Sequence, residues 1–272
     1  MDSQYQSIFS RNIGIVTVTE QEKLFNSTIA IAGMGGVGGL LAERLIRIGL
    51  GNLRITDPGT FEASNLNRQF GSSTLRIGSH KSEAVYKDIR GIDPQSRIQF
   101  SNSGIKTEDD AEKFVAGCDV VIDEMDFGAW KESIYLQRAA RRNGIYYIFA
   151  SAIGFGSLVV VFDPHGITLE EYNKLPPDVD LNTLKGYSVP AEKIIPVMPS
   201  YAASAMSMEQ MQSIIAGKST VPTCSIGVGL TSVLAGGEAI NLILKRRKTV
   251  KAPEYTYVDV IDQKFIIGSA SK

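Results

Sequence analysis

The chain is poor in the residues that build disulfide frameworks and metal centres. Its 272 residues include only two cysteines, Cys118 and Cys224, and two histidines, His80 and His165. Two cysteines cannot form a disulfide framework. The two cysteines lie 106 residues apart in the sequence, so the chain cannot supply the tetrahedral thiolate site that paired Cys-x-x-Cys motifs form around a structural zinc. We therefore expect no structural zinc, and we expect a cytoplasmic protein.

Net charge and long apolar runs are equally scarce. The formal net charge is −1, which gives no support for binding to nucleic acid or to an anionic membrane. The longest apolar stretch, residues 226–244, is interrupted by glycines, Glu238 and Asn241, so we expect no membrane span. The first residues, MDSQYQSIFSRN, lack the charged and then apolar pattern of a signal peptide. These absences leave a globular protein with no nucleic-acid and no membrane partner as the expectation.

A glycine fingerprint between two predicted strands is the main positive feature. The β-branched run 28–32 predicts a strand, and an amphipathic helix follows the glycines. Gly33 would let the chain leave the strand in a tight turn. Gly35 and Gly36 would let the backbone approach a phosphate, and Gly38 would let the helix pack closely against the strand. The N-terminus of that helix would favour an anion.

An acid and a polar cluster follow the second predicted strand. Asp57 comes 19 residues after Gly38, where nucleotide-binding βαβ units carry a carboxylate for the ribose hydroxyls. The hexapeptide SNLNRQ occupies residues 64–69. A guanidinium fork matches phosphate oxygens, and amides can orient them. The candidate phosphate ligands in this cluster are Asn65, Arg68 and Gln69.

Together with the sequence GSHK at residues 78–81, these motifs resemble the ThiF/MoeB family, the bacterial relatives of ubiquitin-activating enzymes. The resemblance is close over residues 8–163 and returns near residues 224–245. It implies a doubly wound, Rossmann-like α/β fold with a mixed eight-stranded sheet. It also implies a homodimeric adenylyltransferase that uses ATP and magnesium to convert a carboxylate into an acyl-adenylate, with release of pyrophosphate.

Individual residues take expected roles from this resemblance. Lys81 opens a predicted helix, where it would meet the ATP phosphates as the family's catalytic lysine does. Asp126 follows the buried strand 120–123 and matches the magnesium-binding aspartate, and Arg11 would reach an ATP phosphate, often across a dimer interface. Cys224 precedes a predicted helix over 226–248 and is a possible nucleophile. It lies closer to the following helix motif than the relatives' cysteine does, so a small buried residue remains the alternative.

The chain departs from the family pattern in several places. Phe127 stands where relatives have asparagine, and Gly59 where many have a second acid. Residues 165–222 do not follow the family's sulfur-carrier-activating pattern, so we expect them to face a different acyl substrate, with Met206 and Met208 in the core. The expected organisation is a single adenylation domain over 1–272. Its parts are an N-terminal arm and helix (1–27), a nucleotide-binding core (28–164), the divergent segment (165–222) and a C-terminal helix with strands (223–272).

Two other functions remain open. A NAD-dependent oxidoreductase would explain the glycine fingerprint and Asp57, but not the SNLNRQ cluster or Lys81. A non-catalytic partner subunit, as occurs in heterodimeric activating enzymes, would explain Phe127 and the missing zinc motif. For the adenylyltransferase, the carboxylate could belong to a ubiquitin-like carrier protein, a peptide or a small biosynthetic acid.

Overall fold

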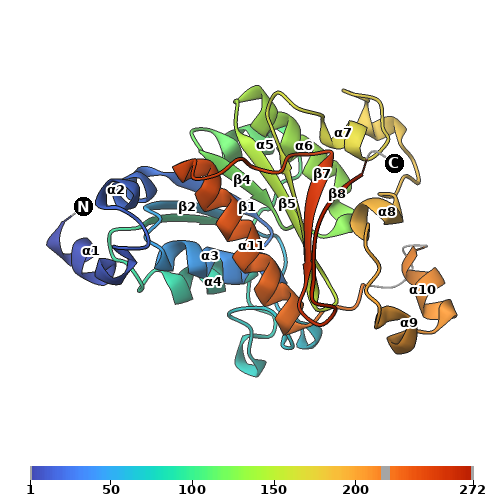
Figure 1. The fold of residues 1–272 in the computed structure, drawn as a ribbon, viewed down its shortest axis with the longest axis horizontal. Helices are drawn as coiled ribbons and strands as arrows, with labels where there is room; N and C mark the ends of the chain where they lie inside the picture. Colours follow the sequence, from blue (N-terminus) through green and yellow to red (C-terminus); the bar gives the residue numbers. More distant parts are fainter. Residues whose placement is uncertain (1, 216–220, 271–272) are drawn as a thin grey trace.

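A computed structural model describes residues 2–215 and 221–270, and their strands form one mixed sheet (Figure 1). The strand order is β3-β2-β1-β4-β5-β6-β7-β8. The parallel strands are β1 (Thr28–Ala32), β2 (Asn52–Thr56), β3 (Arg97–Ser101), β4 (Val120–Asp123) and β5 (Tyr146–Ile153). The antiparallel continuation consists of β6 (Gly156–Phe162), β7 (Glu254–Asp259) and β8 (Lys264–Ser269). The expected mixed eight-stranded sheet is confirmed.

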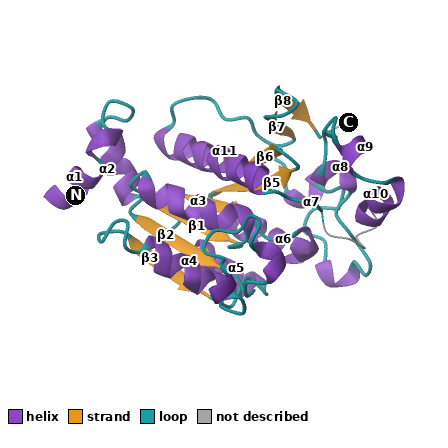
Figure 2. Ribbon diagram, turned by 90° about the horizontal axis from the view of Figure 1, so that it is seen from below, coloured by secondary structure: helices purple, strands orange, loops and turns teal. Residues whose placement is uncertain are grey.

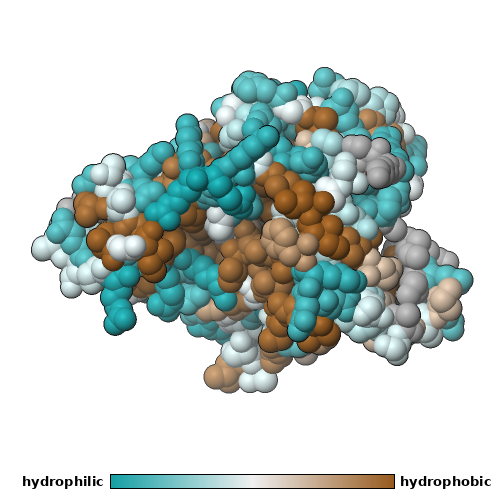
Figure 3. Space-filling model, viewed as in Figure 1, coloured by the Kyte–Doolittle hydropathy of each residue, from teal (hydrophilic) through white to brown (hydrophobic). Residues whose placement is uncertain are grey.

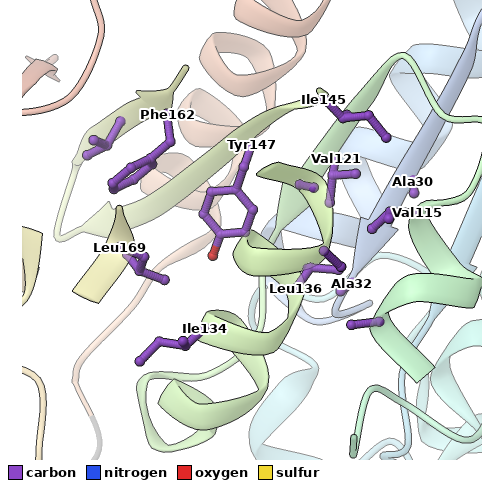
Figure 4. Close-up of a cluster of buried hydrophobic side chains, with 14 of the residues drawn as sticks. Ala30, Ala32, Val115, Val121, Ile134, Leu136, Ile145, Tyr147, Phe162 and Leu169 are labelled. Carbon is purple, nitrogen blue, oxygen red and sulfur yellow. The ribbon is translucent and has the colours of Figure 1, made fainter. Parts of the chain in front are cut away.

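Helices cover both faces of this sheet (Figure 2). Successive side chains of a strand point to opposite faces, so Ala30 and Ala32 belong to one apolar core and Ile29 and Ile31 to the other. The helices of the first core are α5 (Glu108–Val115) and α6 (Trp130–Arg142); those of the second are α3 (Gly36–Arg47), α4 (Lys81–Ile89) and α11 (Ser225–Leu244). Figure 4 shows the first core, where Tyr147 and Phe162 of the sheet lie beside each other and Ile134 of α6 belongs to the same cluster. The doubly wound arrangement is therefore confirmed.

The N-terminal region contains more helix than the sequence predicts. α2 (Val18–Asn26) matches the expected first helix, and a capping box between Thr17 and Glu20 begins it. α1 (Ser3–Ile8) precedes it, where only an arm was expected. Short 3₁₀ turns complete the described chain: η1 (Ser10–Asn12), η2 (Ala63–Asn65), η3 (Thr74–Arg76), η4 (Phe127–Ala129) and η5 (Leu181–Thr183).

α11 ends earlier than the sequence predicts. The helix ends at Leu244, and Lys245 closes it in the left-handed conformation at φ 59°. The basic run 245–248 therefore follows the helix, and Arg246 forms an ion pair with Glu20. By length and composition α11 could cross a membrane, contrary to our expectation from its interruptions. In the structure it packs against α3, β5 and β6.

The described residues of the divergent segment form four short α-helices at the end of the molecule away from the N-terminus (Figure 1). They are α7 (Leu169–Tyr172), α8 (Ala191–Ile194), α9 (Ala202–Ala205) and α10 (Met208–Ile215). Residues 216–220 of this segment lie outside the described residues. The expected core position of Met208 is wrong, because its helix lies beyond the sheet and the side chain is 69% exposed.

Candidate functional site

The glycine turn has the geometry that the fingerprint predicts. Gly33 has a φ of +97°, and a Cβ there would lie 2.3 Å from the carbonyl oxygen of Glu124. A Cβ on Gly38 would lie 1.9 Å from the carbonyl oxygen of Gly33. Neither position can hold a side chain in this backbone, so both glycines are required for the tight turn and for the close approach of α3.

The next two glycines place the N-terminus of α3 beside the SNLNRQ loop. Gly35 is the N-cap of α3, and its nearest neighbour in the Cβ direction is Nε2 of Gln69, at 3.8 Å. A Cβ on Gly36 would lie 3.6 Å from Cγ of Arg68 and 3.0 Å from Val228. The first N–H groups of a helix have no partner within it and favour an anion. The structure therefore brings an anion-binding helix end, the side chain of Arg68 and the amide of Gln69 together.

The polar side chains of this loop are partly committed to the loop itself. The Arg68 guanidinium donates to Ser64 O (3.0 Å) and to Asn67 Oδ1 (2.9 Å), and no carboxylate of the described chain pairs with it. Oε1 of Gln69 is buried and has no hydrogen-bond partner among the described residues. Asn65 is 7% exposed, and its Oδ1 accepts from the backbone N–H of Glu62 at 3.1 Å. Part of the role predicted for Asn65 is therefore structural.

The side chains of Asp57 and Lys81 both lie close to Gly59. Asp57 follows β2, and its two oxygens accept from the backbone N–H groups of Met34 (2.6 Å) and Gly59 (2.7 Å). From the Cβ position of Gly59, Oδ1 of Asp57 is 3.0 Å away and Nζ of Lys81 is 3.6 Å away. Lys81 is the first residue of α4 and forms no ion pair with any described residue. Asp57 thus contacts the glycine turn, and Lys81, a cation without an ion pair in the described chain, lies close to the same glycine as Asp57.

Three acids end the central strand β4. Asp126 is the N-cap of η4, and its exposed carboxylate has no hydrogen bond within the described chain. Asp123 is buried and accepts from the hydroxyl of Tyr147; burial raises its pKa. Sequence reasoning missed Glu124, whose Oε1 is buried without a partner. Burial, followed by the nearby charge of Asp123, raises the pKa of Glu124 well above its ordinary value. The signal for it was the acidic cluster DEMD directly after a buried strand.

Arg11 lies apart from these residues within its own chain. It is exposed in η1, and the neighbouring Asn12 donates to Ile48 O, directly after the C-terminal end of α3. The glycine turn is at the other end of this helix, about 18 Å away for twelve residues. The structure therefore does not bring Arg11 to the other candidate residues of the same chain.

Cys224, in contrast, lies beside the SNLNRQ loop. It is the N-cap of α11, and its Sγ donates to Gly154 O at 3.3 Å. The preceding carbonyl, that of Thr223, accepts from Nδ2 of Asn67 at 3.1 Å. The beginning of α11 is thus held against the β5–β6 turn and the polar loop. The role of Cys224 as a nucleophile stays a prediction.

Curated relatives match part of the chain. The tRNA threonylcarbamoyladenosine dehydratase of Bacillus subtilis (strain 168) is 33% identical over 138 residues, 50% of this chain and 53% of the relative. The ubiquitin-like modifier-activating enzyme 5 of Caenorhabditis elegans is 36% identical over 98 residues, 36% of this chain and 23% of the relative. The chain thus spans about half of the first relative and about a quarter of the second.

Solved structures match nearly the whole chain at low identity. The crystal structure of E. coli MccB with ATP has a TM-score of 0.70 and 16% identity, and the match covers 99% of this chain and 74% of MccB. PaaA has a TM-score of 0.71 and 16% identity, with 100% of this chain and 75% of PaaA covered. At these identities the likeness shows the shared fold. The model of the ThiF family matches residues 9–268, and the chain therefore belongs to the ThiF family.

Proposed function

We propose that this protein is an ATP-dependent adenylyltransferase, which activates a carboxylate as an acyl-adenylate and releases pyrophosphate. One observation carries the proposal. Arg68 lies beside Gly36 at the start of α3, Lys81 lies beside Gly59 close to Asp57, and no carboxylate of the described chain forms an ion pair with either cation. A nicotinamide dinucleotide, with one pyrophosphate, requires less cationic charge than the triphosphate of ATP. The membership of the ThiF family supports the same reading.

The proposed chemistry uses position and charge. A carboxylate oxygen of the substrate attacks the α-phosphorus of ATP, and the bond from that phosphorus to the oxygen bridging to the β-phosphate breaks. Lys81, Arg68 and the helix N–H groups neutralise the charge that develops on the phosphate oxygens. Asp57 holds the ribose, and Asn65 and Gln69 orient the phosphates. No residue of the chain needs to be a nucleophile in this step.

Magnesium fits the residues of the site. Mg²⁺ usually takes one or two protein carboxylates and completes its shell with phosphate oxygens and water. Asp126 offers one exposed carboxylate that no hydrogen bond of the described chain engages. This residue would hold the ion, which supplies further neutralisation of the phosphate charge when bound.

Calorimetric titration tests the proposal. Wild-type protein with Mg²⁺ is titrated with ATP and, separately, with NAD. We expect micromolar ATP binding, which Lys81→Ala abolishes. Lys87→Ala is the matched control, since Lys87 lies on the same helix but pairs with Glu83 on its exposed side. NAD binding without ATP binding would overturn the proposal, as would unchanged ATP binding in Lys81→Ala. Once a substrate is found, the Asp126→Ala variant should fold normally but lose the pyrophosphate exchange that depends on this substrate.

We also propose a homodimer, in which the face formed by α11 and β8 meets a second copy of the chain. Figure 3 shows apolar residues gathered over α11 and the β7–β8 hairpin. Val233 of α11 is 53% exposed, and Phe265 and Ile267 of the edge strand β8 are also exposed. In such a dimer, Arg11 could contact an ATP phosphate in the site of the partner subunit. Sedimentation measures whether each protein is a monomer or a dimer. We expect wild type to be a dimer and Phe265→Lys to be a monomer, and a monomeric wild type contradicts the proposal.

A further inference from the structure

A small cavity adjoins the proposed magnesium ligand on the α6 face of the sheet. Its volume is about 40 Å³, enough for about three water molecules or a few heavy atoms. Its lining includes Asp126 and Phe127, which follow β4, Trp130 of α6 and Phe149 of β5. The divergent segment contributes residues of α7 and α8 to the same lining. A substrate group in this cavity would be next to the carboxylate that meets the α-phosphate.

The divergent segment places a buried cation in this wall. Lys193 of α8 lines the cavity and is 5% exposed. Its Nζ donates to Ala270 O and lies 5.0 Å from the ring centroid of Tyr172, another residue of the wall. No carboxylate of the described chain pairs with Lys193, whereas Lys174 of the same segment pairs with Glu192 at 2.7 Å. Burial lowers the pKa of Lys193.

A buried ammonium group with no carboxylate partner is costly. An ammonium has three donors, and the hydrogen bond to Ala270 O uses one of them. The other surfaces of the cavity are largely apolar and aromatic. Such a cavity suits a short aliphatic chain that ends in an anion, because the walls contact the methylene groups and the ammonium meets the charge.

We propose that this cavity binds an acidic side chain of the substrate, adjacent to the carboxylate that is adenylated, and that Lys193 pairs with this second acid. The inference rests on the proposed function for the position of the reacting carboxylate, and it names the substrate class: a peptide that ends in an acidic residue, or a small dicarboxylic acid. Lys193 of the divergent segment then sets the specificity for this second acid.

Two tripeptides that differ by one charge provide the test. Gly-Gly-Asp and Gly-Gly-Asn have the same C-terminal carboxylate and nearly the same shape. Each is titrated into the full-length protein, first without nucleotide and then with Mg²⁺ and a non-hydrolysable ATP analogue. We expect wild type to prefer Gly-Gly-Asp by roughly tenfold, the effect of one charge-assisted hydrogen bond. Lys193→Gln should erase this preference, while Lys174→Gln, the exposed control in the same segment, should keep it.

Equal affinities for the two tripeptides in wild type, including no binding of either, overturn the proposal. A preference that persists in Lys193→Gln also overturns it. If Lys193→Gln fails to fold because it loses the contact with Ala270, the wild-type comparison and Lys193→Arg, which keeps the cation and should keep the preference, still decide. If ATP does not bind, the proposed function is wrong. The tripeptide titration without nucleotide tests the cavity independently of ATP, so this failure can be distinguished from a failure of the inference about Lys193.

Discussion

The backbone N–H of Met34 donates a 2.6 Å hydrogen bond to Oδ2 of Asp57. Met34 belongs to the glycine turn after β1, and Asp57 follows β2. This bond therefore connects the carboxyl ends of two neighbouring parallel strands. The second oxygen of Asp57 accepts from Gly59. The acid expected to bind ribose therefore also fixes the turn that would bind phosphate.

We expect Asp57→Ala to lower both the stability of the fold and the affinity for ATP. Two backbone N–H groups lose a charged acceptor, which costs about 2 to 4 kcal/mol in the free energy of unfolding. Asp119→Ala is the control, because Asp119 accepts from Thr28 at the other end of β1 (2.8 Å). The control should retain ATP binding. Urea unfolding measures the stability, and calorimetry measures the ATP affinity. If Asp57→Ala is as stable as wild type, Asp57 does not stabilise the glycine turn as proposed.

Alanine at two glycines of the same turn, Gly35 and Gly38, should affect stability very differently. In Gly38→Ala the new Cβ meets the carbonyl of Gly33 at 1.9 Å, so we expect a loss of about 3 kcal/mol or more in stability. In Gly35→Ala the nearest atom is 3.8 Å away, so the fold should lose less than about 1 kcal/mol. ATP affinity should nevertheless fall, since the methyl group faces the region proposed for phosphate. Thermal unfolding of both variants checks this, and equal stabilities would disprove the assigned packing.

The sequence predicted the elements that depend on local patterns. β1 and β4 have the expected boundaries, and α4 begins at Lys81 as expected, because β-branched runs and helical spacing are contained within each segment. The glycine requirement at Gly33 and Gly38 was also predictable, since a strand followed by a closely packed helix needs those positions free of side chains.

Features that depend on the assembled sheet were not predictable. The burial of Glu124 follows from the position of β4 beside β1 at the centre of the sheet. The distance of Arg11 from the glycine turn follows from how η1 docks at the far end of α3. Lys193 became a candidate only because the structure places it and Asp126 in the lining of one cavity, and the divergent segment carries no motif that points to this position.

A carboxylate anchors the divergent segment to the β7–β8 turn, and we expect this anchor to depend on pH. Ser200 donates to both oxygens of Asp262, through its N–H (2.9 Å) and its hydroxyl (2.5 Å). These bonds, followed by one from Lys264, lower the pKa of Asp262 from 3.8 to about 2. A lowered folded-state pKa stabilises the protein above the ordinary value, and the contribution is lost as pH falls from about 4 to 2.

The stability difference between wild type and Asp262→Ala should therefore be constant at neutral pH and shrink below pH 4. Denaturant unfolding at a series of pH values measures it. Glu22→Gln, at an exposed helix position without an ion pair in the described chain, is the control. A difference that grows as the pH falls would have the wrong sign and would contradict the anchor.

The two cysteines should react differently with iodoacetamide at pH 8. Burial raises the pKa of Cys118 to about 11, so only on the order of one molecule in a thousand carries its thiolate at that pH. Cys224 is partly exposed at the start of α11. We expect one label per native chain, at Cys224, and two labels after unfolding. Labelling of Cys118 in the native state would contradict its burial.

The role of Cys224 then follows from comparing two reactions. Its Sγ contacts Gly154 O, beside the proposed phosphate site, but the proposed adenylation step uses no protein nucleophile. Cys224→Ala should therefore leave ATP binding, and pyrophosphate exchange with an identified substrate, within about twofold of wild type. If the thiol accepts the acyl group, only the later transfer fails in this variant, and a mass increase by the acyl group appears on wild type alone. A tenfold loss of exchange would instead place the thiol in the adenylation step and contradict the proposed chemistry.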